Sequence, residues 1–303
     1  RGLLLWMSHS CWPSLVWSTY DYWFDPTGAF YGCKGLTSIE IPKKVTKIEE
    51  STFTNCFGLT SINIHEKITS IGRYAFSGCT GLTNVTIPET VTSIGDAVFQ
   101  SCRKLESVTL PKNITKIGQY FFVYCSALKN ITIPENVTEI GSYAFQGCSS
   151  LKNITIPEKV AIINNNAFFN CSNLTSMSIL STAAVTYIKD NKGNYNTFGD
   201  CNKLKYVFLY QESVVGDLTD IFPTNVERFF VPDDLLDGEN GYRIQYNNIS
   251  KDKFVGFSYL EKEETSADEE KAFQHKMMQK DIGRDGKVEV VSFGSGNRSV
   301  LKQ

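Results

Sequence analysis

The sequence predicts an α/β-type solenoid, a coil of short parallel strands that is rich in β-structure. Seven cysteines follow one another at a constant spacing of 23 residues. A phenylalanine stands three positions before each of them and a leucine three positions after it, from Phe30-Cys33-Leu36 to Phe168-Cys171-Leu174. A proline-terminated pair of apolar residues follows each leucine in most units. Units of this length stack on one another, because none of them buries its apolar side chains alone.

The first part of each unit predicts a short strand. In the first unit Ile39 and Ile41 alternate with polar residues, and this period of two points both isoleucines inward and their neighbours outward. Pro42 follows and removes a backbone N–H from the ladder, which ends the strand. The later units keep this order, so we expect one such strand in every coil.

The second part of each unit predicts another strand and a turn. Val45 and Ile48 belong to a β-rich run, which predicts a second narrow strand on another face of the coil. The segment Ala-Phe-x-x-Cys has few β-branched residues and predicts one helical or 3₁₀ turn that places Phe and Cys in the interior. A glycine just before this segment, as at Gly72, is expected to supply a tight corner.

The full consensus, L-x-x-(I/V)-x-I-P-x-x-(V/I)-T-x-I-G-x-x-A-F-x-x-C, resembles the BspA-like leucine-rich repeat surface protein family. The likeness is close over residues 29–180 and loose over 195–260. It implies a right-handed leucine-rich repeat coil with N- and C-terminal caps. It also implies a non-catalytic cell-surface or secreted module for adhesion and recognition, with a protein or glycoconjugate ligand on a host or neighbouring cell as its partner.

The chain divides into four predicted parts. Residues 1–29 hold all four tryptophans and form an N-terminal aromatic cap over the open end of the first coil. Residues 30–180 are the regular 23-residue repeats. Residues 181–260 contain an insertion loop, degenerate repeats and a C-terminal cap, and 261–303 form a charged tail. For the first part, a carbohydrate or membrane platform and the end of a secretory signal remain alternatives.

The third and fourth parts carry weaker signals. Ser181 to Thr197 is a polar insertion that predicts a protruding loop, and Cys201 marks a late repeat behind it. In the tail, Ala267 to Lys280 predicts a short helix. The stretch after Asp281 partly resembles a calcium loop, but it departs from that pattern at two ligand positions, so we assign no metal site.

Little in the sequence indicates catalysis or a cofactor. The three histidines belong to different segments, and His65, which stands where other repeats have proline, is interpreted as a solvated substitution. No C-x-x-C, G-x-S-x-G or P-loop motif occurs. The ladder of cysteines is interpreted as free buried thiols, with disulfides or a metal as the alternative. We therefore expect no enzyme, no cofactor and no metal.

Composition argues against a nucleic-acid partner and against a membrane-spanning helix. The formal net charge is −2 and the basic residues are scattered, so a nucleic-acid partner is not expected. No stretch approaches the ~20 consecutive apolar residues of a membrane-spanning helix. The oligomeric state is not predicted.

The outward strand positions are the candidate ligand-binding face. They are small and polar, and parallel stacking aligns them in columns one strand spacing apart. The alternative is that Ser, Thr and Asn are simply good solvent-facing strand residues. The assigned residues are Glu40, Asn63, Asn84, Thr86, Thr109, Asn130, Thr132, Asn153, Thr155 and Ser178.

The family resemblance places the protein at the cell surface or outside the cell. A cytoplasmic protein is the alternative, in which the array would be a structural or scaffolding solenoid that mediates protein–protein contacts. Nine cysteines without evident pairing would suit that reducing compartment.

Overall fold

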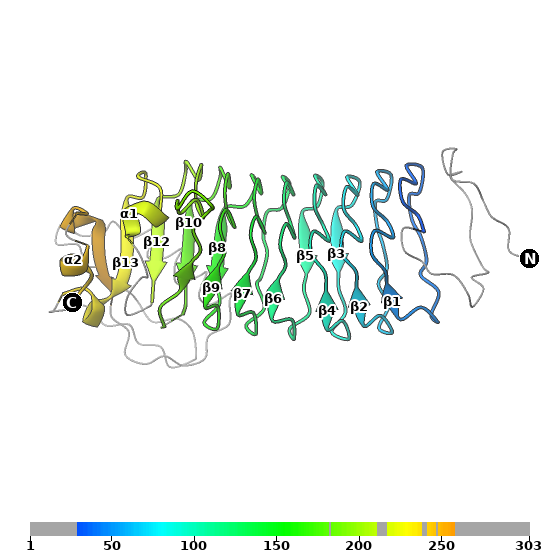
Figure 1. Cartoon of the computed structure of the whole chain (residues 1–303), viewed down its shortest axis with the longest axis horizontal. Coiled ribbons are helices and arrows are strands. Elements are labelled where there is room, and N and C mark those ends of the chain that lie inside the picture. The colour runs from blue at the N-terminus through cyan, green and yellow to red at the C-terminus, as the bar shows by residue number, and fades with distance from the viewer. Residues whose placement is uncertain (1–28, 182, 211–216, 238–240, 247, 258–303) are drawn as a thin grey trace, which may run out of the picture.

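A computed structural model describes residues 29–181, 183–210, 217–237, 241–246 and 248–257. Over these residues the chain is a parallel-strand β-solenoid with little helix, as the repeats predict, and its coils stack side by side in chain order (Figure 1). The predicted aromatic cap and the charged tail, with its calcium-like stretch, lie outside the described residues. The four-part division of the chain therefore stays a prediction.

The predicted first strand of each unit forms one row along the array. Its members are β3 (Asn84–Thr86), β5 (Ser107–Thr109), β8 (Asn153–Ile156), β10 (Ser176–Ile179), β12 (Tyr206–Leu209), β13 (Arg228–Pro232) and β14 (Phe254–Phe257). The last five form one parallel sheet in the order β14-β13-β12-β10-β8, and β3 pairs with β5. Isolated parallel bridges, Glu40 with Asn63 and Ser107 with Asn130, extend the row into the other coils.

The predicted second strand forms another row on a different side of the coil (Figure 1). These strands are two residues long, and they form the parallel sheets β1-β2-β4 and β6-β7-β9-β11. Their bounds are β1 (Lys47–Ile48), β2 (Ser70–Ile71), β4 (Ser93–Ile94), β6 (Lys116–Ile117), β7 (Glu139–Ile140), β9 (Ile162–Ile163) and β11 (Thr186–Tyr187). The prediction of a second narrow strand is thus confirmed.

The prediction of a helical or 3₁₀ turn at the third corner was wrong, because the described part of residues 29–181 contains only turns there. Two residues of each turn are left-handed, as at Tyr74 with φ 56° and Gly78 with φ 72°. Alternate N–H groups then point along the array. Phe53 donates its N–H to the Ala75 carbonyl of the next coil at 2.8 Å. This corner is therefore a third ladder of hydrogen bonds between coils. In a helix the same N–H groups would bond to carbonyls of the helix itself and would not reach the next coil.

The recurrent glycine before this corner has a different role from the one predicted. Gly72, Gly95 and Gly141 do not have a positive φ. A Cβ atom on Gly95 would instead lie 2.5 Å from the backbone nitrogen of Arg73 in the preceding coil. The corresponding distances to backbone nitrogen are 2.5 Å at Gly72 and 2.7 Å at Gly141. Glycine is required because adjacent coils approach closely here, and the corner itself does not need a left-handed residue.

The core is a column of apolar side chains that runs the length of the array. Its phenylalanines stack ring on ring, with centroids 5.0–5.7 Å apart from each coil to the next. These rings belong to Phe30, Phe53, Phe76, Phe99, Phe122, Phe145, Phe168, Phe198 and Phe222. The repeat leucines from Leu59 to Leu204 are fully buried beside them.

The array continues through the insertion into degenerate coils. Phe198 stacks on Phe168, so the late repeat is confirmed, and part of the insertion joins the second row as β11. Asp190 accepts hydrogen bonds from the N–H groups of Lys192 and Asn194, which folds the remainder into a tight loop and lowers the pKa of its carboxyl. The closing coils contain α1 (Leu218–Ile221), η1 (Asp233–Leu235), α2 (Tyr242–Gln245) and η2 (Lys251–Lys253).

Replacement of Leu128 by alanine should lower the free energy of unfolding by about 2–5 kcal/mol, because Leu128 is fully buried and its truncation leaves a cavity. Urea denaturation measures the change. The control is Thr132→Ala in the exposed part of the same coil, which should stay within about ±0.5 kcal/mol. A cost below ~0.5 kcal/mol for Leu128→Ala would contradict the assigned core.

Replacement of Gly95 by alanine should destabilise the array, by at least as much as the ~1–3 kcal/mol typical of overpacking, because the new Cβ meets backbone atoms of the neighbouring coil. The matched control is Ser93→Ala, an exposed position two residues earlier. Thermal unfolding of both variants gives the comparison. Equal midpoints would show that the coils can separate at this corner without cost.

Candidate functional site: the outer strand face

The ten residues assigned from the sequence are here called the outer strand face. The structure places the first eight of them, from Glu40 to Asn153, on the exposed side of the first strand row, while Thr155 is half-buried. The alternation is clear in β3 and β5, where Val85 and Val108 are buried between exposed neighbours. The polar columns predicted from the repeats therefore exist in the first half of the array.

The assignment of Ser178 to an exposed face was wrong. Ser178 is fully buried, and its neighbour Ser176 is 1% exposed. The parallel register pairs Ser178 with Phe208, and the Phe208 ring stacks on Phe230 with centroids 4.4 Å apart. Bulky aromatic side chains thus occupy the outward positions beside Ser178, so the exposed polar face ends before β10.

Some of the remaining polar groups bind one another between coils. Ser107 donates its hydroxyl to Asn84 Oδ1 at 2.6 Å, and Ser176 donates to Asn153 Oδ1 at 2.7 Å. The two asparagines therefore help to hold adjacent coils in register. The hydroxyls of Thr86, Thr109 and Thr132 make no hydrogen bond within the described part of the chain. They form an exposed, uncharged column whose hydrogen-bonding capacity is open to a ligand.

A shallow hollow of about 380 Å³ adjoins this column. It lies where the pairing recorded for the first strand row stops, between the bridge at Asn63 and strand β3. Two amide side chains and two hydroxyls border it, and apolar side chains form part of its wall, so it can contact a ligand with both polar and apolar groups. Its lining is Ser61, Ile62, Asn63, Ile64, Asn84, Thr86 and Pro88.

Sequence reasoning missed this hollow, although the coil that borders it departs from the repeat at His65. The interpretation of His65 as a solvated substitution was also wrong, since the side chain is only 9% exposed. Its Nδ1 accepts the N–H of Lys67 at 3.2 Å, which leaves Nε2 to donate to the Pro42 carbonyl at 3.2 Å. Both ring nitrogens are used by the backbone, so His65 fills a structural position.

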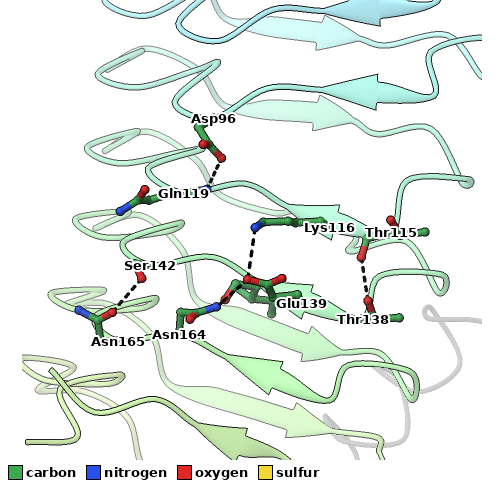
Figure 2. Close-up of polar contacts among 10 residues, drawn as sticks. Asp96, Thr115, Lys116, Gln119, Thr138, Glu139, Ser142, Asn164 and Asn165 are labelled. Atoms are coloured by element: carbon green, nitrogen blue, oxygen red, sulfur yellow. Dashed lines mark hydrogen bonds and ion pairs between the residues drawn. The ribbon is translucent and has the colours of Figure 1, made fainter. Parts of the chain in front are cut away.

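The second strand row uses many of its polar side chains to join coils (Figure 2). Glu139 binds Lys116 at 3.3 Å and accepts a hydrogen bond from Asn164 at 3.0 Å. Along the same row Thr138 donates its hydroxyl to the Thr115 carbonyl at 3.2 Å. Lys116 and Glu139 are 49% and 33% exposed, so their ion pair contributes little by itself. Because these side chains bond to the neighbouring coil, their donors and acceptors are less available to a ligand than the hydroxyls of Thr86, Thr109 and Thr132.

The cysteine ladder is a structural feature without reactive thiols. Seven cysteines are free and buried, and each donates its thiol to the carbonyl of the phenylalanine in the preceding coil, with sulfur–oxygen distances of 3.0–3.3 Å. Burial raises the pKa of Cys56 to about 12 and raises that of Cys102 well above its ordinary value. A thiol of this kind does not supply the thiolate that nucleophilic or metal chemistry requires.

The prediction of free thiols was wrong for one member of the ladder. Cys33, in the first described coil, is disulfide-bonded.

Among the described residues no group of three or more His, Cys, Asp or Glu side chains is placed to hold a metal ion. The same part of the chain contains no helix with the length and apolar character needed to cross a membrane.

Comparison with known proteins identifies the repeat. A family model described as the BspA type Leucine rich repeat region matches residues 26–129 and 115–221, in 6 copies. The crystal structure of a T. pallidum leucine-rich repeat protein is 26% identical over 55% of this chain and 78% of that chain, with a TM-score of 0.51. A Bacteroides ovatus leucine-rich repeat protein is 25% identical over 75% of this chain and 61% of that chain, with a TM-score of 0.44.

One curated protein shares a short stretch. An exo-beta-D-glucosaminidase of Hypocrea jecorina is 41% identical over 39 residues, which are 13% of this chain and 4% of that protein. A match of this extent covers fewer than two repeats, so it carries no argument about activity. The chain spans only that small share of this relative, and less than two thirds of the Bacteroides ovatus protein.

The buried thiols should make the protein less stable in alkali. Between pH 9.0 and about 12 the unfolded chain releases the Cys56 proton while the folded chain keeps it. The free energy of unfolding should therefore fall as pH rises, by about 1.4 kcal/mol per pH unit for each such thiol. Urea denaturation between pH 8 and 10.5 measures the slope. Cys56→Ala should show a shallower slope than the parent, and equal slopes would contradict the assigned burial.

Proposed function

Because the chain belongs to the family of BspA-type leucine-rich repeat proteins, whose arrays serve in recognition, we propose that it is a non-catalytic module that binds protein or glycoconjugate ligands at the cell surface or outside the cell. The ligand-binding site is the exposed part of the outer strand face. The observation that carries this assignment is the column of free hydroxyls at Thr86, Thr109 and Thr132 beside the hollow at Asn63 and Asn84.

The rigidity of the array supports binding at this face. Strand pairing fixes Thr86 opposite Thr109, and the core residue Val85 between the outward positions is 3% exposed. Little conformational entropy is then lost when a ligand orders these side chains, and preorganised groups bind more tightly than mobile ones. Each coil offers similar groups at one strand spacing, so a long ligand gains contacts with several coils at once.

The charge of the face favours an uncharged or weakly charged ligand surface. The three threonines carry no charge, and the adjacent column contains Glu106 and Lys129, which pair at 2.7 Å. Such a pair offers no strong field to steer a partner. Recognition then depends on hydrogen bonds to hydroxyl, amide or carbonyl groups and on contact with the apolar wall of the hollow, which both glycan and peptide surfaces can supply.

The test uses two triple variants of matched composition. A printed array of extracellular-matrix proteins and purified glycans first identifies a ligand for the parent protein. Thr86→Arg, Thr109→Arg and Thr132→Arg together should then weaken binding at least tenfold, because three bulky charged side chains cover the site. The control changes Thr92, Thr115 and Thr138 to arginine, which are exposed in the same three coils but on the other strand row.

The control variant should bind within about twofold of the parent, which corresponds to roughly 0.4 kcal/mol. Circular dichroism should show both variants folded. Equal binding by the two variants would place the ligand elsewhere. A loss confined to the Thr92, Thr115 and Thr138 variant would move the site to the second strand row.

A further inference from the structure

Three consecutive coils carry no charge at the corner that follows the second strand row. Residues 118–128, 141–151 and 164–174 contain no Asp, Glu, Lys, Arg or His. These three segments are here called the uncharged corner. The equivalent segments of the neighbouring coils are charged, with Asp96 on one side and Asp200 on the other. A charged group finds no opposite charge on the uncharged corner, so charge complementarity favours a neutral ligand there.

Tyr124 supplies an exposed aromatic ring in the first of these coils. It is 49% exposed, and its ring lies against Gly147 of the next coil, where a Cβ atom would lie 2.7 Å from Tyr124 Cδ1. Its N–H donates to the Gln146 carbonyl at 2.7 Å, which ties the residue to that coil. The ring is therefore supported by backbone and offers its remaining surface to a ligand at little cost in conformational entropy.

Two more tyrosines extend the aromatic surface. Tyr120 and Tyr143 are half-buried, and their rings stack with centroids 5.0 Å apart and an interplanar angle of 10°. Ala97 and Asn166 hold the equivalent left-handed positions in the coils on either side, so no third ring continues the stack. Within the described part of the chain the hydroxyls of Tyr120, Tyr124 and Tyr143 make no hydrogen bond. All three can therefore donate to a ligand and accept from it.

Amide side chains are the other main polar groups of the uncharged corner. Ser142 donates its hydroxyl to Asn165 Oδ1 at 2.8 Å, which leaves the Asn165 amide nitrogen to donate elsewhere (Figure 2). Gln146 and Asn166 are half-buried and Asn170 is exposed. The side-chain amides of these three residues make no hydrogen bond among the described residues. The corner thus combines aromatic rings with free amide donors and acceptors.

We propose that the uncharged corner binds a neutral oligosaccharide. One face of a pyranose consists largely of C–H groups and packs on an aromatic ring, while its hydroxyls need the donors and acceptors that amides supply. A protein ligand is less well matched, because protein interfaces are enriched in Met and Arg as well as in aromatic residues, and the three segments contain neither. Equivalent groups recur at one strand spacing, so a chain of sugars can contact more than one coil.

A binding screen of the full-length protein tests the ligand class. The probes are printed neutral oligosaccharides of glucose, galactose, mannose or N-acetylglucosamine, with sulfated and sialylated oligosaccharides as the charged set. At least one neutral oligosaccharide should bind. Its affinity should change by less than about twofold when NaCl is raised from about 0.05 to 0.5 M, because salt screens only interactions between charges. Binding of the charged set alone, no binding at all, or a strong salt dependence would overturn the proposal.

Variants of the corner test the site. Tyr124→Ala should weaken binding of the selected oligosaccharide at least tenfold, and Tyr124→Phe should stay within about threefold of the parent, because it keeps the ring. Gln146→Ala should weaken binding by about threefold or more, and it changes no left-handed residue, so its effect does not depend on a strained turn. Phe57→Ala is the control, since it removes a ring that is 40% exposed outside the uncharged corner. Circular dichroism checks that each variant is folded.

The outcomes separate this site from the outer strand face. Parent-like binding by both Tyr124→Ala and Gln146→Ala would refute the site. The variant with arginine at Thr86, Thr109 and Thr132 should keep its affinity for the neutral oligosaccharide. If that variant loses the sugar while Tyr124→Ala retains it, the oligosaccharide binds the outer strand face and the uncharged corner is not its site.

Discussion

The contact of each coil with the next is the constraint on which the whole structure depends. A single coil has a phenylalanine, a cysteine and a leucine that it cannot cover, and the equivalent residues of its neighbours cover them. The stacked phenylalanines repeat every 5.0–5.7 Å, so one continuous core replaces many small ones. Stability is then largely a sum of contacts between adjacent coils, and the two ends are its weak points.

This close stacking also decides which side chains remain free to bind. Glycine is needed at Gly72 and Gly95 because backbones meet there, and cysteine suits the ladder because its thiol fits beside a carbonyl of the preceding coil. On the second strand row, ion pairs such as Lys116 with Glu139 join adjacent coils. The threonine column of the outer strand face is not used in this way. It is held rigidly by the core behind it, yet its hydroxyls are unoccupied within the described residues.

The cysteines illustrate how one residue type can have two roles in one array. Inside the stack, burial keeps the thiol protonated and makes it a small apolar side chain with a weak hydrogen bond. Cys33, at the same repeat position in the first described coil, is disulfide-bonded.

The sequence by itself determined the solenoid, the two strand rows, the inward phenylalanines and leucines, and most of the exposed polar columns. These features follow from periodicity, because a repeat of 23 residues places chemically equivalent side chains at equivalent points of every coil. Only the tertiary structure decided the burial of Ser178, the left-handed turns at residues such as Tyr74, the close approach at Gly95 and the hollow beside Asn63. Each of these depends on atoms of a neighbouring coil or on a backbone angle that residue type does not reveal, and distances between coils are set by packing.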